Sequence, residues 1–102
     1  MSQELIDLLE KEWELDTGFL GRLRQGFFDE EGCRRCQATL ERVVLEARAA
    51  ENLPRRLVSL VWYIPLFMTW QRARVRETVN PNEYERVTNS FEAKVEEILG
   101  VP

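Results

Sequence analysis

The sequence predicts an all-α protein, folded as an antiparallel four-helix bundle. Apolar residues recur at spacings of three and four, which indicates amphipathic helices. The 102 residues form one domain of four segments, each of about twenty residues, and their short connections favour antiparallel neighbours. Strand-like alternation occurs only in Arg72-Ala73-Arg74-Val75-Arg76, where the surrounding spacing is helical.

The first helix is expected over Gln3–Gln25, with Ser2 as its N-cap. Gly18 and Gly21 weaken its middle, each by up to about 1 kcal/mol relative to Ala, so a break near Gly18 is the alternative. Gly26 is expected to end the segment in a left-handed conformation.

The second and fourth helices have clear start signals. The second is expected to begin after Asp29, as N-cap, and to reach about Glu51. The fourth should begin with Asn80 as N-cap and Pro81 in the first helical position, and it should end before Gly100.

The third helix, from Pro54 to about Glu77, is the central apolar helix of the predicted bundle. Its middle, Leu57–Trp70, is apolar on every side. At 1.5 Å per residue this run spans about 21 Å, short of the roughly 30 Å core of a bilayer, so a buried helix is expected rather than a membrane span. Pro65 lacks an N–H and should kink the helix or split it.

Composition removes several kinds of chemistry. The chain has no histidine, which excludes histidine triads and histidine zinc sites. Its net charge is −4, so no global positive field attracts a phosphate backbone. The N-terminus has acids where a signal peptide has bases, which makes cytoplasmic residence the expectation. We expect no cofactor and no metal.

Cys33 and Cys36 form a C-x-x-C motif one turn into the second helix. The helix dipole and the two intervening arginines would lower the thiol pKa values, as in reactive dithiols. A small thiol oxidoreductase is therefore one hypothesis. Two further interpretations are that the cysteines are small core residues, or that they supply half of a zinc site shared with a second chain.

The third segment carries more apolar surface than one small core requires. Its aromatic residues are followed by arginines, and these residue types are enriched at binding hot spots. We therefore expect a partner-binding surface, either for another protein or for a second copy of the chain. Its candidate residues are Trp62, Phe67, Trp70, Arg72 and Arg76.

Four acids, Glu10, Glu12, Glu14 and Asp16, precede Gly18 and Gly21. We interpret it as a solvated helix face. Such a cluster could also steer a basic partner, as small acidic inhibitors and immunity proteins do with nucleases.

The function that fits these features is that of a small, acidic, non-enzymatic protein that binds a protein partner, in the manner of an inhibitor, immunity protein or adaptor. The alternatives are the thiol oxidoreductase and a nucleic-acid-associated regulator. The regulator would use the local basic residues, which are Arg55, Arg56, Arg72, Arg74 and Arg76.

Overall fold

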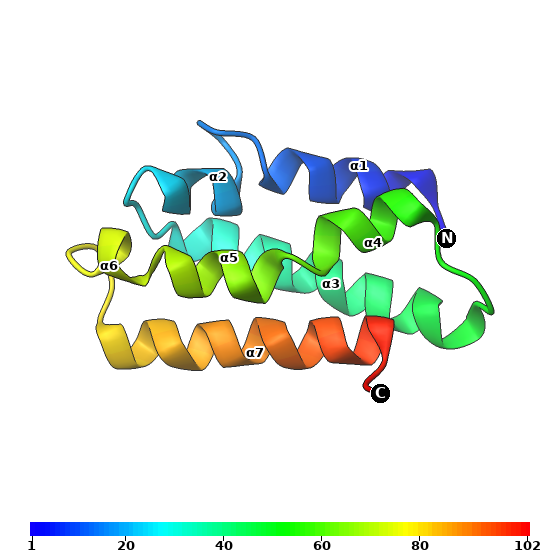
Figure 1. The fold of residues 1–102 in the computed structure, drawn as a ribbon. Helices are drawn as coiled ribbons and strands as arrows, with labels where there is room; N and C mark the ends of the chain where they lie inside the picture. The colour runs from blue at the N-terminus through cyan, green and yellow to red at the C-terminus, as the bar shows by residue number, and fades with distance from the viewer.

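Every regular element of the protein is an α-helix. The computed structural model describes all 102 residues and contains no strand. The helices are α1 (Gln3–Glu12), α2 (Phe19–Arg24), α3 (Glu30–Ala49), α4 (Arg55–Val61), α5 (Ile64–Trp70), α6 (Arg72–Val75) and α7 (Pro81–Leu99) (Figure 1). The predicted all-α class is confirmed. No helix combines the length and the apolar character needed to cross a bilayer.

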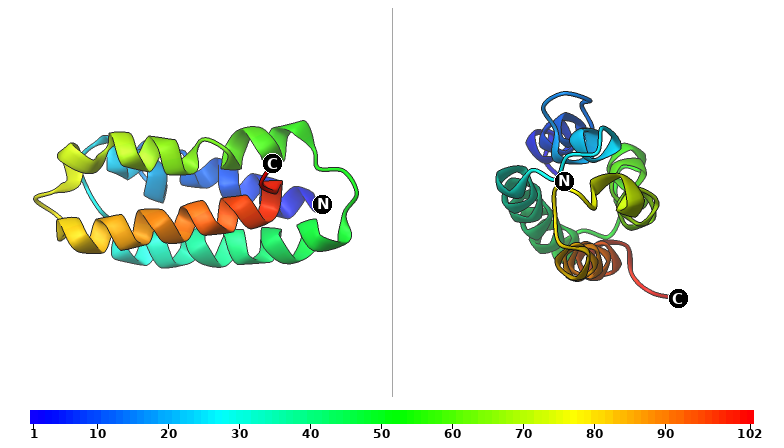
Figure 2. Two further views of the ribbon diagram at one scale, coloured as in Figure 1. Left: turned by 60° about the horizontal axis from the view of Figure 1, so that its bottom comes forward. Right: turned by 90° about the vertical axis from the view of Figure 1, so that its left-hand side faces the viewer.

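The helices lie along one long axis of a molecule that measures 42 × 28 × 19 Å. The chain passes along this axis through α1 and α2, returns in α3, passes again through α4, α5 and α6, and returns in α7 (Figures 1 and 2). Helices α1 and α3 are antiparallel neighbours, as expected. Ion pairs join Glu4 to Arg42 near one end of this helix pair and Glu12 to Arg35 near the other.

Two other neighbouring pairs are parallel, which corrects the prediction of antiparallel neighbours throughout. Between α3 and α7, ion pairs join Glu41 to Lys94 and Arg48 to Glu97, so residue numbers rise together along both helices. Helices α1 and α4 also run in the same direction. The segment 50–54 carries the chain across the end of the molecule (Figure 2), and a short connection in the sequence does not reveal which helix it leads to.

The first segment is broken, as the alternative interpretation allowed. Helix α1 ends at Glu12 and α2 begins at Phe19. A Cβ at Gly18 would lie 2.3 Å from the Glu12 carbonyl oxygen, and one at Gly21 would lie 1.9 Å from that of Glu14. Glycine is therefore required at both positions because helix and loop backbones touch there.

The third segment is divided rather than kinked. Helix α4 ends at Val61 and α5 begins at Ile64, with Pro65 in its first turn. A continuous helix would need a hydrogen bond from the N–H of residue 65 to the carbonyl group of Val61. Pro65 has no N–H and cannot donate it. A second interruption at Gln71 separates the single turn of α6.

The start and end signals of α7 act as expected. The Asn80 side chain accepts hydrogen bonds from the backbone N–H groups of Asn82 (2.8 Å) and Glu83 (3.2 Å). Gly26 and Gly100 also end their segments as expected, because both have left-handed φ values, of +88° and +87°.

Ser2 and Asp29 precede their helices without capping them through their side chains. The backbone N–H of Ser2 instead donates to Glu46 (3.1 Å). Asp29 accepts a hydrogen bond from Arg22 (3.1 Å), so its carboxylate links α2 to the start of α3.

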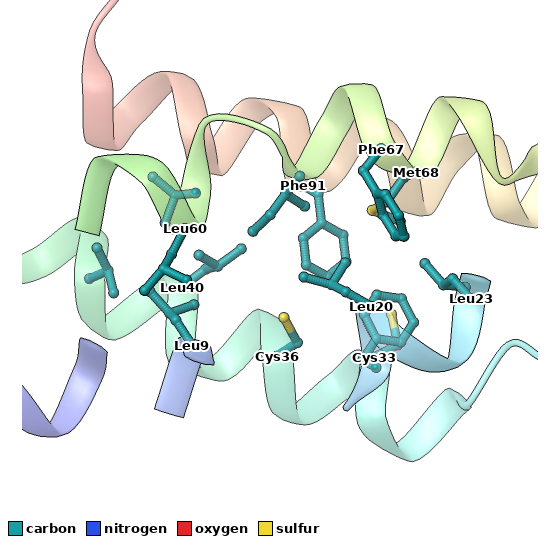
Figure 3. Packing of buried hydrophobic residues seen from close by; sticks show 14 of the residues in the cluster. Leu9, Leu20, Leu23, Cys33, Cys36, Leu40, Leu60, Phe67, Met68 and Phe91 are labelled. Carbon is teal, nitrogen blue, oxygen red and sulfur yellow. The ribbon is translucent and has the colours of Figure 1, made fainter. Parts of the chain in front are cut away.

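A single apolar core connects all seven helices. Figure 3 shows its centre, where Leu20, Phe67 and Phe91 converge from α2, α5 and α7. The Tyr84 hydroxyl is buried with them and donates to the carbonyl oxygen of Met68 (2.7 Å). This bond fixes α5 against α7 and leaves the opposite face of α5 free.

Candidate functional site

An exposed apolar row begins at the junction between α4 and α5 and runs along the outer face of α5. Trp62, Leu66 and Trp70 are spaced by four residues and are 52%, 41% and 60% exposed. The half-buried Tyr63 ring lies between the two tryptophans, with its centroid 5.3 Å from that of Trp62 and 5.8 Å from that of Trp70. We call these four residues the aromatic stripe. Side chains of this size are normally buried, so the stripe is surface that the chain's own core leaves uncovered.

A cleft of about 410 Å³ opens at the end of the aromatic stripe. Trp70 forms one wall, Tyr84 and Pro81 of the first α7 turn lie at another, and Arg72 and Arg76 border it from α6 and its C-terminal end. Three of the five predicted surface residues therefore meet at one place. Sequence spacing had not indicated the contribution of α7, because α7 lies beside this cleft only through tertiary packing.

The arginines around this surface are largely uncompensated. Arg72 and Arg76 are exposed, and neither lies in an ion pair. Arg74 donates to the carbonyl oxygen of Arg24 (3.1 Å), which holds it at the α2 side of α6. Between residues 52 and 77 there are five arginines and a single acid, Glu77. Arg55 and Arg56 lie in α4, away from the cleft, and Arg56 pairs with Glu10. The positive charge at the cleft therefore comes from Arg72 and Arg76, and no acid lines the cleft.

Phe67 is not part of this surface, which corrects its place in the predicted set. Its side chain is only 2% exposed and lies in the core. The Trp13 ring packs edge-on against it at 5.0 Å between centroids, and the Arg24 guanidinium lies 5.2 Å from its centre. Helix α5 buries Ile64, Phe67 and Met68, so the face that carries Phe67 is the inner one.

Cys33 and Cys36 are buried thiols rather than accessible ones. Both point into the core from α3 (Figure 3), and neither forms a disulfide. Burial raises the pKa of Cys33 to about 11 despite the nearby charge of Arg34. Burial also raises the pKa of Cys36 well above its ordinary value. The expectation that the dipole and the arginines would lower these pKa values is wrong, because desolvation of the thiolate is the larger effect.

Glu12 departs most from its expected environment. It is 3% exposed, although the sequence placed it on a solvated acidic face. Its carboxylate accepts two hydrogen bonds from Arg35 and a third from the backbone N–H of Phe19 (3.0 Å). One signal was present in the sequence, since Glu12 follows Leu5 and Leu9 at the spacing of the core face. Its role is structural, because it joins the broken first segment to α3.

No group of three or more cysteine, aspartate and glutamate side chains is arranged to hold a metal ion. What the fold does present is an all-helical scaffold with one aromatic and arginine-rich face. Comparison of the chain with protein-family models, curated proteins and solved structures finds no match.

Proposed function

We propose that this chain is a small non-enzymatic binding protein that docks a protein partner on the aromatic stripe and the adjoining cleft. One observation carries the proposal. Trp62 and Trp70 remain more than half exposed, although twenty-two other residues form a continuous core. Tryptophan, tyrosine and arginine are the residue types that most often carry binding energy at protein interfaces. An inhibitor, an immunity protein and an adaptor all fit this mode of action.

The thiol oxidoreductase alternative lacks comparable support. A redox dithiol needs an accessible thiolate, whereas burial keeps both cysteines protonated at neutral pH. The nucleic-acid alternative draws on the same arginines, but Arg55 and Arg56 lie in α4 at the other end of the stripe. Arg56 is also neutralised by Glu10 at 2.9 Å.

Two further parts of the proposal concern architecture and location. We infer that the fold is a variant of the four-helix bundle, in which two of the four helical columns consist of short helices and some neighbours are parallel. A cytoplasmic location suits the two reduced thiols, since free cysteines persist in reducing compartments.

The test is capture of a partner by the wild-type chain and by a Trp62→Ala/Trp70→Ala variant, followed by reconstitution with the purified partner. Loss of at least about tenfold in affinity is expected for the double variant, as for removal of hot-spot residues. Leu45→Ala is the matched control, because Leu45 is 61% exposed on α3, away from the stripe. Equal binding by the double variant and the control would refute the proposed surface.

A further inference from the structure

We propose that the occupant of this surface is an acidic amphipathic helix of another protein. Its apolar side chains would cover the aromatic stripe, and its carboxylates would reach Arg72 and Arg76. This inference rests on the proposed function and specifies the chemistry of the partner.

The apolar part of the surface matches one side of a helix. From Trp62 to Trp70 the stripe runs through the junction of α4 and α5, whose two residues have helical dihedral angles, and along α5; eight residues at 1.5 Å each give about 12 Å. Two to three turns of a partner helix would cover this length with apolar residues at spacings of three and four. The cleft beyond Trp70, at about 410 Å³, has room for a further large apolar side chain.

The charged part of the surface selects an acidic partner. Arg72 and Arg76 border the cleft without an ion-pair partner in the chain. A guanidinium group binds a carboxylate through two parallel hydrogen bonds, so each arginine is suited to an Asp or Glu side chain. No acid lines the cleft, so a basic partner would meet repulsion from Arg72 and Arg76.

A second copy of the chain fits this surface less well. A symmetric dimer through the stripe would offer Arg72 and Arg76 no carboxylate, because a twofold interface uses the same patch twice and neither the stripe nor the cleft lining contains an acid. The acidic helices α1 and α7 of a second copy could not cover the stripe either. Their apolar rows face the core, and Leu99 at the C-terminal end is the only large apolar residue exposed on either helix.

Selection from a displayed library of random 16-residue peptides tests this inference on the intact chain. Enriched peptides are expected to carry several Asp or Glu residues beside apolar residues at helical spacing. A synthetic copy of an enriched peptide should bind at least about tenfold more weakly to Trp70→Ala and to Arg72→Glu/Arg76→Glu than to the wild type. The charge-reversed variant should regain affinity for a peptide whose acids are changed to Lys, which a misfolded variant could not do.

Arg48→Glu is the matched charge control, because Arg48 is exposed on α3 and pairs only with Glu97 at 3.4 Å. Trp70-dependent peptides without acidic residues would overturn the inference and leave the proposed function standing. Absence of any Trp70-dependent peptide would also overturn the inference, whereas the proposed function is refuted only by the partner-capture test. Tighter binding of a single-stranded oligonucleotide at the same residues would overturn the inference in favour of a nucleic acid. Dimerisation that Trp70→Ala abolishes would overturn it in favour of a second copy of the chain.

Discussion

Arg35 donates two hydrogen bonds, of 2.9 Å and 2.8 Å, to the carboxylate of Glu12. The acid side chain is 4% exposed and the arginine side chain 49%, so the pair lies at the edge of the core with its negative member inside. Hydrogen bonding to Glu12 raises the pKa of Arg35. The same carboxylate accepts from the N–H of Phe19 and thereby caps the first turn of α2. One side chain therefore links α1, α2 and α3.

Removing the two members of this pair should have unequal consequences. Arg35→Ala leaves a buried carboxylate with one remaining partner and should lower the free energy of unfolding by about 3 kcal/mol. Glu12→Gln keeps an acceptor for Phe19 and leaves only a half-exposed arginine unpaired, so about 1 to 2 kcal/mol is expected. Urea denaturation of both variants measures the difference.

The exposed pair between Glu4 and Arg42, at 3.0 Å, is the control for this experiment. Arg42→Ala should change the unfolding free energy by less than about 1 kcal/mol, as surface ion pairs do. If Arg35→Ala cost no more than Arg42→Ala, the carboxylate of Glu12 would not hold the three helices together.

Gly21→Ala should destabilise the protein, although alanine is the better helix former. In an open helix the change would stabilise by up to about 1 kcal/mol. Here the new Cβ would lie 1.9 Å from the backbone oxygen of Glu14, so α2 must move away from the preceding loop. We expect a net loss of about 2 kcal/mol or more, measured by thermal and urea unfolding.

Gly32→Ala is the matched control in α3. Its new Cβ would meet only the side-chain atoms of Asp29 and Arg35, of which the nearest lies 2.6 Å away. Side chains can move where backbone cannot, so the loss should be smaller than for Gly21→Ala, about 1 kcal/mol, and should come from shifting the Asp29 carboxylate that accepts from Arg22. Similar losses for the two alanine variants would show that the close approach at Gly21 does not govern α2.

Much of the fold could be predicted from local signals. Asn80, Pro81 and Gly100 mark a helix that the structure places at Pro81–Leu99, because caps and stops act within a few residues. The order of neighbours could not be predicted in this way. It depends on where the segment 50–54 takes the chain at the end of the molecule, and amphipathic spacing gives the buried face of a helix without naming its neighbour.

The candidate site was predictable in part for a related reason. Trp62, Trp70 and the arginines were found from residue type and order along the chain, which the structure brings to one face. Phe67 was misplaced because a segment that is apolar at every position does not show which face is the inner one, even though a kink or a split at Pro65 was expected. The break before Pro65 sets a new face for α5, which buries Phe67 and exposes Leu66.

Asn80 and Ser2 should contribute differently to the free energy of unfolding, because only Asn80 caps its helix with side-chain hydrogen bonds. Asn80→Ala removes an acceptor used by two backbone N–H groups and should cost about 1 kcal/mol of unfolding free energy. Ser2→Ala removes a hydroxyl that makes no cap bond, so a change of under about 0.5 kcal/mol is expected. Chemical denaturation of the two variants side by side measures this. Equal losses would mean that the Asn80 cap contributes no more than an uncapped position.

The buried cysteines should make the protein less stable in alkali. Between pH 9 and pH 11 the unfolded chain loses the Cys33 proton and the folded chain keeps it, since burial raises its pKa to about 11. The unfolded state then binds fewer protons, so the unfolding free energy falls as pH rises, by about 2 to 3 kcal/mol for a shift of two pKa units. Urea midpoints at pH 8 and pH 10.5 measure this fall. Cys33→Ala should show a smaller fall than the wild type, whatever it costs at pH 8.

Native thiols should also react slowly with a disulfide reagent at pH 8. Rapid reaction there, with an equal alkaline fall in both proteins, would mean that Cys33 is accessible and would restore the redox hypothesis.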